Sequence, residues 1–122
     1  MNNPADFETV FNALKNILTP YSEDLVIVTD EAGHYYLNTA FIMKNKKPMY
    51  FGSVKINKKY VSFHLMPVYV FPELLETISP DLKHRMQGKS CFNFSKIDVH
   101  LFNELTSLTK NSVAAFTKAG YL

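Results

Sequence analysis

Apolar residues recur at intervals of three and four near both ends of the chain. Such spacing places one apolar stripe along a helix. The first stripe consists of Phe7, Val10, Phe11, Leu14 and Leu18, and the helix that it predicts ends before Pro20. The second consists of Leu101, Leu105, Leu108, Ser112 and Ala115. It predicts a helix that starts near Ser95, where "SKID" resembles a capping box, and ends at Gly120.

Short runs of β-branched and aromatic residues occupy the middle of the chain and predict strands at 24–30, 34–43, 49–56, 59–66 and 90–94. Pro72 and the pair Ser79-Pro80 introduce two short helical segments between the last two strands. Most connections have the length of hairpin loops. The pattern therefore predicts a single domain over residues 1–122, of the α+β class, with an antiparallel sheet packed against the N- and C-terminal helices.

The stretch "MYFGSVKINKKYVSFHLMPVY" (Met49–Tyr69) predicts a hairpin with a two-residue turn at Asn57-Lys58. With that turn, alternation assigns one face to the core, made of Tyr50, Gly52, Val54, Val61, Phe63 and Leu65. The other face receives the pairs Met49/Met66, Phe51/His64, Ser53/Ser62 and Lys55/Tyr60. We expect this second face to be either a half-solvated sheet surface or a shallow ligand site. The candidate ligand-binding residues are Met49, Phe51, His64 and Met66.

The composition limits the classes of partner. The net charge is +2, and Arg85 is the only arginine among 13 basic residues, so specific nucleic-acid recognition is not expected. Lysines nevertheless gather around the predicted hairpin, namely Lys44, Lys46, Lys47, Lys55, Lys58 and Lys59. They serve either to keep sheet edges soluble or, with Lys55, Lys58 and Lys59 beside Tyr50 and Tyr60, to bind nucleic acid weakly.

No catalytic constellation is visible in the sequence. Cys91 follows Lys89, whose charge lowers a thiol pKa, but a lone cysteine in an apolar strand is more typical of a buried core residue. The four histidines lack the spacing of a zinc site. No secretory signal and no apolar run long enough for a membrane span is present. We therefore expect a cytoplasmic, non-enzymatic binding or adaptor module without a cofactor, for an unknown small molecule or protein, with homodimerisation left open.

Two short motifs resemble the YdhG-like family of small bacterial proteins of unknown function. They are "KINKKYVSF", through Lys55 and Tyr60–Phe63, and "GKSCFNF", through Gly88–Ser90 and Phe94. The likeness extends over about residues 36–119. It implies an α+β domain related in shape to frataxin, and iron delivery as an alternative function. The adjacent acidic pairs Glu23/Asp24 and Asp30/Glu31 are then the candidate iron ligands.

Overall fold

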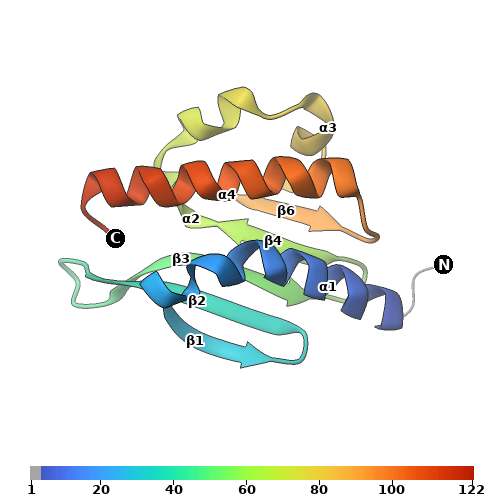
Figure 1. Cartoon of the computed structure of the whole chain (residues 1–122), viewed down its shortest axis with the longest axis horizontal. Coiled ribbons are helices and arrows are strands. Elements are labelled where there is room, and N and C mark those ends of the chain that lie inside the picture. Colours follow the sequence, from blue (N-terminus) through green and yellow to red (C-terminus); the bar gives the residue numbers. More distant parts are fainter. Residues whose placement is uncertain (1–3) are drawn as a thin grey trace.

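The computed structural model describes residues 4–122 and confirms an α+β fold with an antiparallel sheet and a helix at each end (Figure 1). Six strands lie in the order β1-β2-β3-β4-β6-β5. They are β1 (Val26–Glu31), β2 (His34–Ile42), β3 (Pro48–Ile56), β4 (Val61–Leu65), β5 (Met86–Gln87) and β6 (Cys91–Phe94).

The helices are α1 (Pro4–Leu18), α2 (Met66–Val70), α3 (Pro80–Lys83) and α4 (Val99–Ala119). Of two 3₁₀ segments, η1 (Thr19–Asp24) joins α1 to β1, and η2 (Pro72–Thr77) joins α2 to α3. Both long helices lie on the same side of the sheet (Figure 1). Their apolar stripes are buried there with the inward residues of the central strands. The predicted stripes are thus confirmed except at Ala115, which is only partly buried; Phe102 and Phe116 join the buried side of α4. The opposite side of the sheet has no long helix over it.

An extra residue in β3 determines which side chains enter this core. Leu37 pairs with Gly52, but the next residue of β2, Asn38, pairs with Tyr50, so Phe51 has no partner. Such a β-bulge breaks the alternation of faces. Phe51 therefore lies inside, with 0% exposure, and its ring meets that of Phe116 in α4 at a centroid distance of 6.0 Å. The prediction that Phe51 shares a face with His64 is wrong, and so is the assignment of Tyr50 to the core.

The turn between β3 and β4 also differs from the prediction. Ile56 pairs with Val61, so the loop has four residues, closed by a hydrogen bond from the Asn57 N–H to the Tyr60 carbonyl oxygen (2.8 Å). The register is therefore shifted by two positions. A shift by an even number leaves every side chain of β4 on its expected face. Phe63 is buried as predicted, although it lies opposite Val54 and not opposite Gly52.

Three further features depart from the sequence prediction: the end of β4, the presence of β5 and the start of α4. β4 ends at Leu65, and Met66 already begins α2, with Pro67 in its first turn. The two-residue strand β5 was not predicted, and Gly88 lies in the turn that follows it, at φ 79°. The last helix starts later than expected. Its N-cap is Asp98, whose carboxylate accepts a hydrogen bond from the Leu101 N–H at 3.0 Å.

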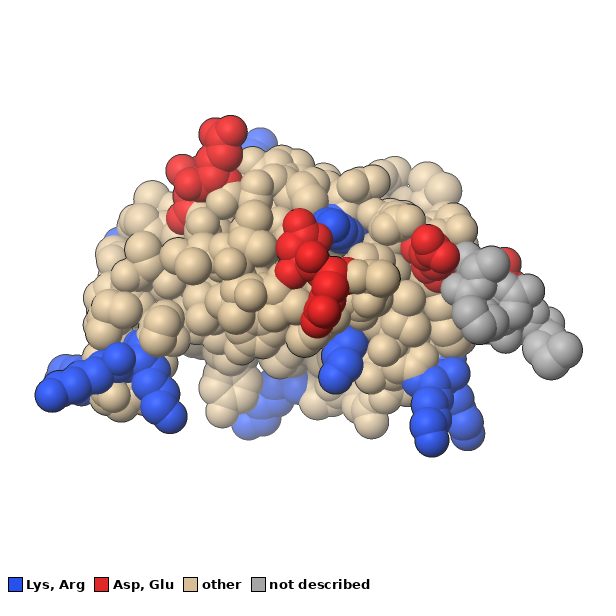
Figure 2. Space-filling model, turned by 90° about the horizontal axis from the view of Figure 1, so that it is seen from below, with Lys and Arg blue, Asp and Glu red and all other residues tan. Residues whose placement is uncertain are grey.

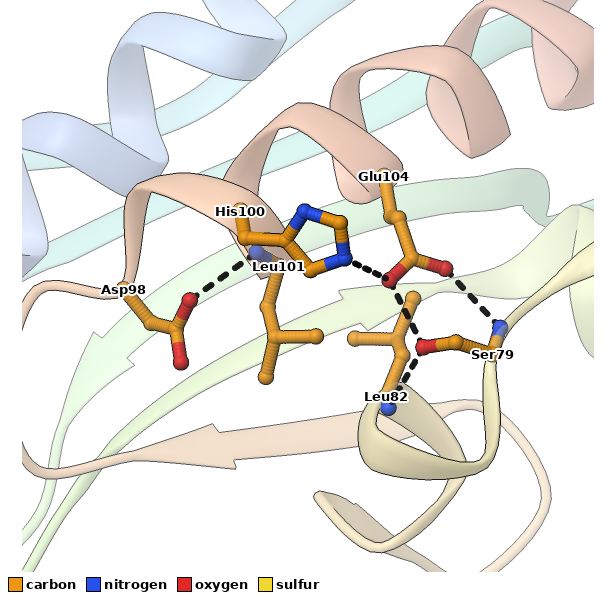
Figure 3. Close-up of polar contacts among 6 residues, drawn as sticks. All are labelled: Ser79, Leu82, Asp98, His100, Leu101 and Glu104. Carbon is orange, nitrogen blue, oxygen red and sulfur yellow. Dashed lines mark hydrogen bonds and ion pairs between the residues drawn. The ribbon is translucent and has the colours of Figure 1, made fainter.

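A small polar cluster fastens the η2–α3 segment to α4 (Figure 3). The Glu104 carboxylate accepts hydrogen bonds from the Ser79 backbone N–H (2.9 Å) and from the Ser79 hydroxyl (2.7 Å). The same hydroxyl accepts a hydrogen bond from the Leu82 N–H at 3.2 Å and so caps α3. The bonds from Ser79 lower the pKa of Glu104, because they favour its charged form. A four-residue helix is thereby held in a fixed position beside the sheet.

We expect Gly52→Ala to destabilise the fold strongly. An added Cβ would lie 2.6 Å from the backbone oxygen of His64, which cannot move without breaking the β3–β4 ladder. Overpacking of this kind costs about 1–3 kcal/mol in the free energy of unfolding, measurable by urea denaturation. Gly88→Ala is the matched control, because it meets open space and carries only the strain of a positive φ. Equal losses in the two variants would contradict the close approach at Gly52.

Candidate functional site

The side of the sheet away from α1 and α4, called the uncovered face below, carries polar and aromatic residues. The strand registers assign to it His34, Tyr36, Asn38, Tyr50, Ser53, Lys55, Ser62, His64, Gln87, Cys91 and Asn93. Most of these residues are partly exposed. None of these residues is a leucine, isoleucine, valine or phenylalanine, but Val26 of β1 pairs with Asn38 and adds an exposed valine to this face. The face is therefore unlike the buried side of a sheet, and also unlike the apolar surface of an obligate dimer.

Four rings form a continuous row across this face, called the aromatic row below. Tyr36 on β2 stacks on Tyr50 of β3, with ring centroids 4.7 Å apart and planes 22° from parallel. His34 meets the edge of Tyr36 at 6.1 Å, and His64 of β4 meets Tyr50 at 5.2 Å. Tyr50 can join the row only because the bulge turns it outward. Its hydroxyl shares a hydrogen bond with Ser53, and burial raises its pKa, so the phenol stays neutral.

A chain of side-chain hydrogen bonds lies next to the aromatic row. The Asn57 amide donates to the Ser62 hydroxyl (2.9 Å), which donates to Oδ1 of Asn93 (3.0 Å). The Asn93 amide in turn donates to Oε1 of Gln87 (2.8 Å). These groups come from β4, β5, β6 and the β3–β4 loop. They fix one another's orientation and leave amide and hydroxyl groups on a partly exposed surface, where a polar ligand can meet them.

His64 and Cys91 are direct neighbours across β4 and β6, and each side chain has a different hydrogen-bond partner. The imidazole Nε2 bonds to the Ser90 hydroxyl, and the thiol donates weakly to Oδ1 of Asn93 at 3.6 Å. Burial lowers the pKa of His64 and raises the pKa of Cys91. Both groups are thereby held neutral near pH 7, whereas a nucleophilic cysteine needs a lowered thiol pKa.

The four predicted ligand-binding residues are not brought together. His64 does lie on the uncovered face, but Phe51 is fully buried on the opposite side. Met49 and Met66 pack against the edge of the core, and Met66 belongs to α2 and not to a strand. The residue that replaces them in the site is Tyr36, whose face follows from regular strand alternation once Leu37 is assigned to the core.

The proposed iron ligands also lie apart. Glu23 and Asp24 end η1, whereas Asp30 and Glu31 end β1. Nζ of Lys15 lies 2.7 Å from Oδ1 of Asp30, so that carboxylate already has a cationic partner. Within residues 4–122, no group of three or more histidine, cysteine, aspartate or glutamate side chains is arranged to hold a metal ion.

Lysines concentrate on the side of the uncovered face. Lys55 lies on it directly, where it pairs with His34 of β2 and Ser62 of β4. Lys58 and Lys59 are exposed in the loop that follows β3, and Lys44, Lys46 and Lys47 precede β3 at its other end. Figure 2 shows blue side chains along the lower border of the molecule, which is the side away from α1 and α4. Lysines therefore lie near both ends of β3, the strand that contributes Tyr50 to the aromatic row.

Comparisons of the chain with protein-family models, with curated proteins and with solved structures find no match. The likeness to the YdhG-like family stays a prediction. None of the helices among the described residues combines the length and the apolar character needed to cross a bilayer.

We expect His64 to make stability depend on pH. Its pKa in the folded protein lies below the value of about 6.5 in an unfolded chain. Between these two values the unfolded state binds more protons, so the free energy of unfolding falls as the pH drops below about 6.5. Urea denaturation at pH 7 and pH 5 should show a larger loss for the wild type than for His64→Gln. Equal losses, or an imidazole that titrates at or above 6.5 by NMR, would contradict this account.

We also expect the thiol of Cys91 to react slowly with iodoacetamide near neutral pH, because its raised pKa leaves little thiolate. The protein has a single cysteine, so the rate can be followed by mass spectrometry without ambiguity. Unfolding in urea should accelerate alkylation several-fold. Alkylation of the folded protein as fast as that of the unfolded chain would instead point to an activated thiol.

Proposed function

We propose that this protein is a non-enzymatic binding module whose ligand lies on the uncovered face of the sheet, over Tyr36, Tyr50 and His64. The observation that carries the proposal is the aromatic row, which crosses three strands on a face without a covering helix. Core packing does not require these rings, because the opposite face already holds the apolar residues of the same strands. Contiguous rings on an open surface are typical of a contact site.

The chemistry of the face favours a flat, polar ligand. Tyrosine and histidine rings offer surfaces for stacking and keep polar atoms at their edges. Beside them, the Ser62–Asn93–Gln87 chain supplies fixed amide and hydroxyl groups that can orient a ligand by hydrogen bonds. The neutral thiol of Cys91 and the neutral imidazole of His64 support binding over covalent catalysis.

A second candidate is single-stranded nucleic acid, and the position of Lys55 favours it. This lysine lies on the same face as the aromatic row, and Lys58 and Lys59 follow it in the adjoining loop. Proteins that bind single strands without sequence preference combine stacking rings with a positively charged path for the backbone. Lysine point charges serve that purpose, whereas the scarcity of arginine disfavours the reading of base edges.

The test is a titration of the protein with nucleosides and with single-stranded oligothymidylate of about ten nucleotides, followed by amide NMR shifts and fluorescence anisotropy. We expect shifts at Tyr36, Tyr50, Ser62 and His64. Tyr36→Ala should weaken binding about tenfold, which corresponds to the loss of one stacking contact. Tyr69→Ala, which removes an exposed ring of α2, is the matched control and should leave affinity unchanged.

The arms of this titration separate the two candidates. Nucleoside binding that is insensitive to salt supports a small flat ligand, whereas oligonucleotide binding that falls steeply with salt supports nucleic acid. Binding of either probe that Tyr36→Ala leaves unchanged, or shifts confined to other surfaces, would reject the aromatic row as the site.

A further inference from the structure

Exposed apolar side chains concentrate at one edge of the sheet. Val26, Ile27 and Val28 of β1 retain 46%, 48% and 53% of their surface, and Phe41 and Ile42 of the adjoining β2 retain 37% and 57%. They are five of the eight large apolar residues that are exposed in the described part of the chain. Phe41 and Ile42 lie beyond the part of β2 that pairs with β1, which ends at Asn38, so the contiguous group is Val26–Val28. Scattered exposed apolar residues are ordinary, but three in succession on an edge strand mark an interaction surface.

β1 is also the outermost strand, so its outer backbone groups have no partner strand. Along such an edge, every second residue directs its N–H and C=O away from the sheet. Natural proteins usually protect long edges with lysine or proline, and Val26–Glu31 contains neither. The bulge at Val28, between the pairs of Ile27 and Thr29, bends the strand but leaves both of its ends accessible.

Acidic residues flank the apolar stretch on both sides. Glu23 and Asp24 precede it, and Asp30 and Glu31 follow it. Figure 2 views the molecule from the β1 side and shows acidic side chains near the middle of this side, with basic side chains next to them. Of these acids, Asp30 is paired with Lys15. The apolar residues of β1 therefore lie between two acidic pairs, one at the end of η1 and one at the end of β1 itself.

This charge pattern disfavours pairing of the edge with a second copy of itself. An antiparallel pair over the strand residues Val26–Glu31 would place Glu31 opposite Val26 and Asp30 opposite Ile27, so each carboxylate would be buried against an apolar side chain. A parallel pair in register would place each acid opposite its own copy. Like charges directly opposite one another destabilise a strand pair. The complementary occupant is an extended segment with an apolar centre and basic residues at both ends.

We propose that the outer edge of β1 binds such a segment of a partner protein as an added strand. Main-chain hydrogen bonds to β1 would supply affinity, and contacts with Val26, Ile27 and Val28 would cover the exposed apolar surface. Lysine or arginine at both ends of the segment would face the flanking acids, set its register and exclude a second copy of this chain. This site uses the backbone edge of β1, whereas the ligand site proposed above uses the rings of β2, β3 and β4; the two adjoin where Val26 pairs with Asn38 and Glu31 pairs with His34.

The test uses a fluorescent peptide of about nine residues, with alternating valine and threonine in its centre and lysines at both ends. A second peptide carries glutamates in place of the lysines, and a third is the lysine peptide with alternate backbone nitrogens methylated, which blocks strand pairing. We expect anisotropy to show binding of the first peptide only, with the other two at least about tenfold weaker. Amide NMR shifts should map to β1.

Variants distinguish binding of the peptide at the edge of β1 from nonspecific binding elsewhere on the surface. Ile27→Lys places a charge on the edge and should weaken binding at least about tenfold. Val99→Lys makes the same kind of change at an exposed valine of α4 and should have no effect. The triple variant Glu23→Gln, Asp24→Asn, Glu31→Gln should remove the preference for the lysine peptide over the glutamate peptide. Unfolding midpoints verify that each variant is folded.

Several results would overturn the proposal. Equal binding of the lysine and glutamate peptides would remove the role of the flanking acids, and unchanged binding of the methylated peptide would exclude strand addition. Unaltered affinity in Ile27→Lys would exclude the edge itself. A wild-type dimer in sedimentation that Ile27→Lys converts to a monomer would show that a second copy, and not a basic segment, occupies β1.

Discussion

One extra residue in β3 determines how this sheet presents its two sides. At Gly52 the strand pairs regularly with β2, but Phe51 is inserted before pairing resumes at Tyr50. Two successive residues can point inward here because Gly52 has no side chain, and its backbone approaches the carbonyl oxygen of His64 closely. Burial of the Phe51 ring against Phe116 contributes about 2–3 kcal/mol and offsets the lost ladder hydrogen bond. The outward position of Tyr50 on the uncovered face follows from this insertion.

The bulge joins the fold to the proposed function. Without it, Tyr50 would enter the core and Phe51 would stand beside His64, so the row of rings would be interrupted by an apolar side chain. With it, Tyr36, Tyr50 and His64 are continuous, and the polar chain through Ser62 and Asn93 borders them. The helices cover the other side only, so two surfaces of the sheet stay exposed, and they adjoin at Val26 and Glu31. One is the aromatic and polar face, and the other is the apolar edge of β1 with acids at both ends.

The sequence predicted those features that depend on periodicity alone. Both long helices, the α+β class and the faces of β4 follow from spacing, and the faces of β4 withstood an error of two residues in the register because parity is preserved. The bulge could not be predicted, since it arises from the tertiary fit of Phe51 against a helix some 65 positions later in the chain. The strand β5 is two residues long and carries no pattern of its own. Site residues whose face depends on alternation within one strand, such as Tyr36, could be predicted from the sequence. Tyr50, whose face depends on the bulge, could not.

The most direct test of this account is the pattern of side-chain NOEs around residues 50 and 51. We predict NOEs between the rings of Tyr50 and His64 and between the rings of Phe51 and Phe116, whose centroids lie 5.2 Å and 6.0 Å apart. NOEs between Phe51 and His64, together with contacts of Tyr50 to the buried side of α4, would show an uninterrupted strand and would contradict both the bulge and the site built on it.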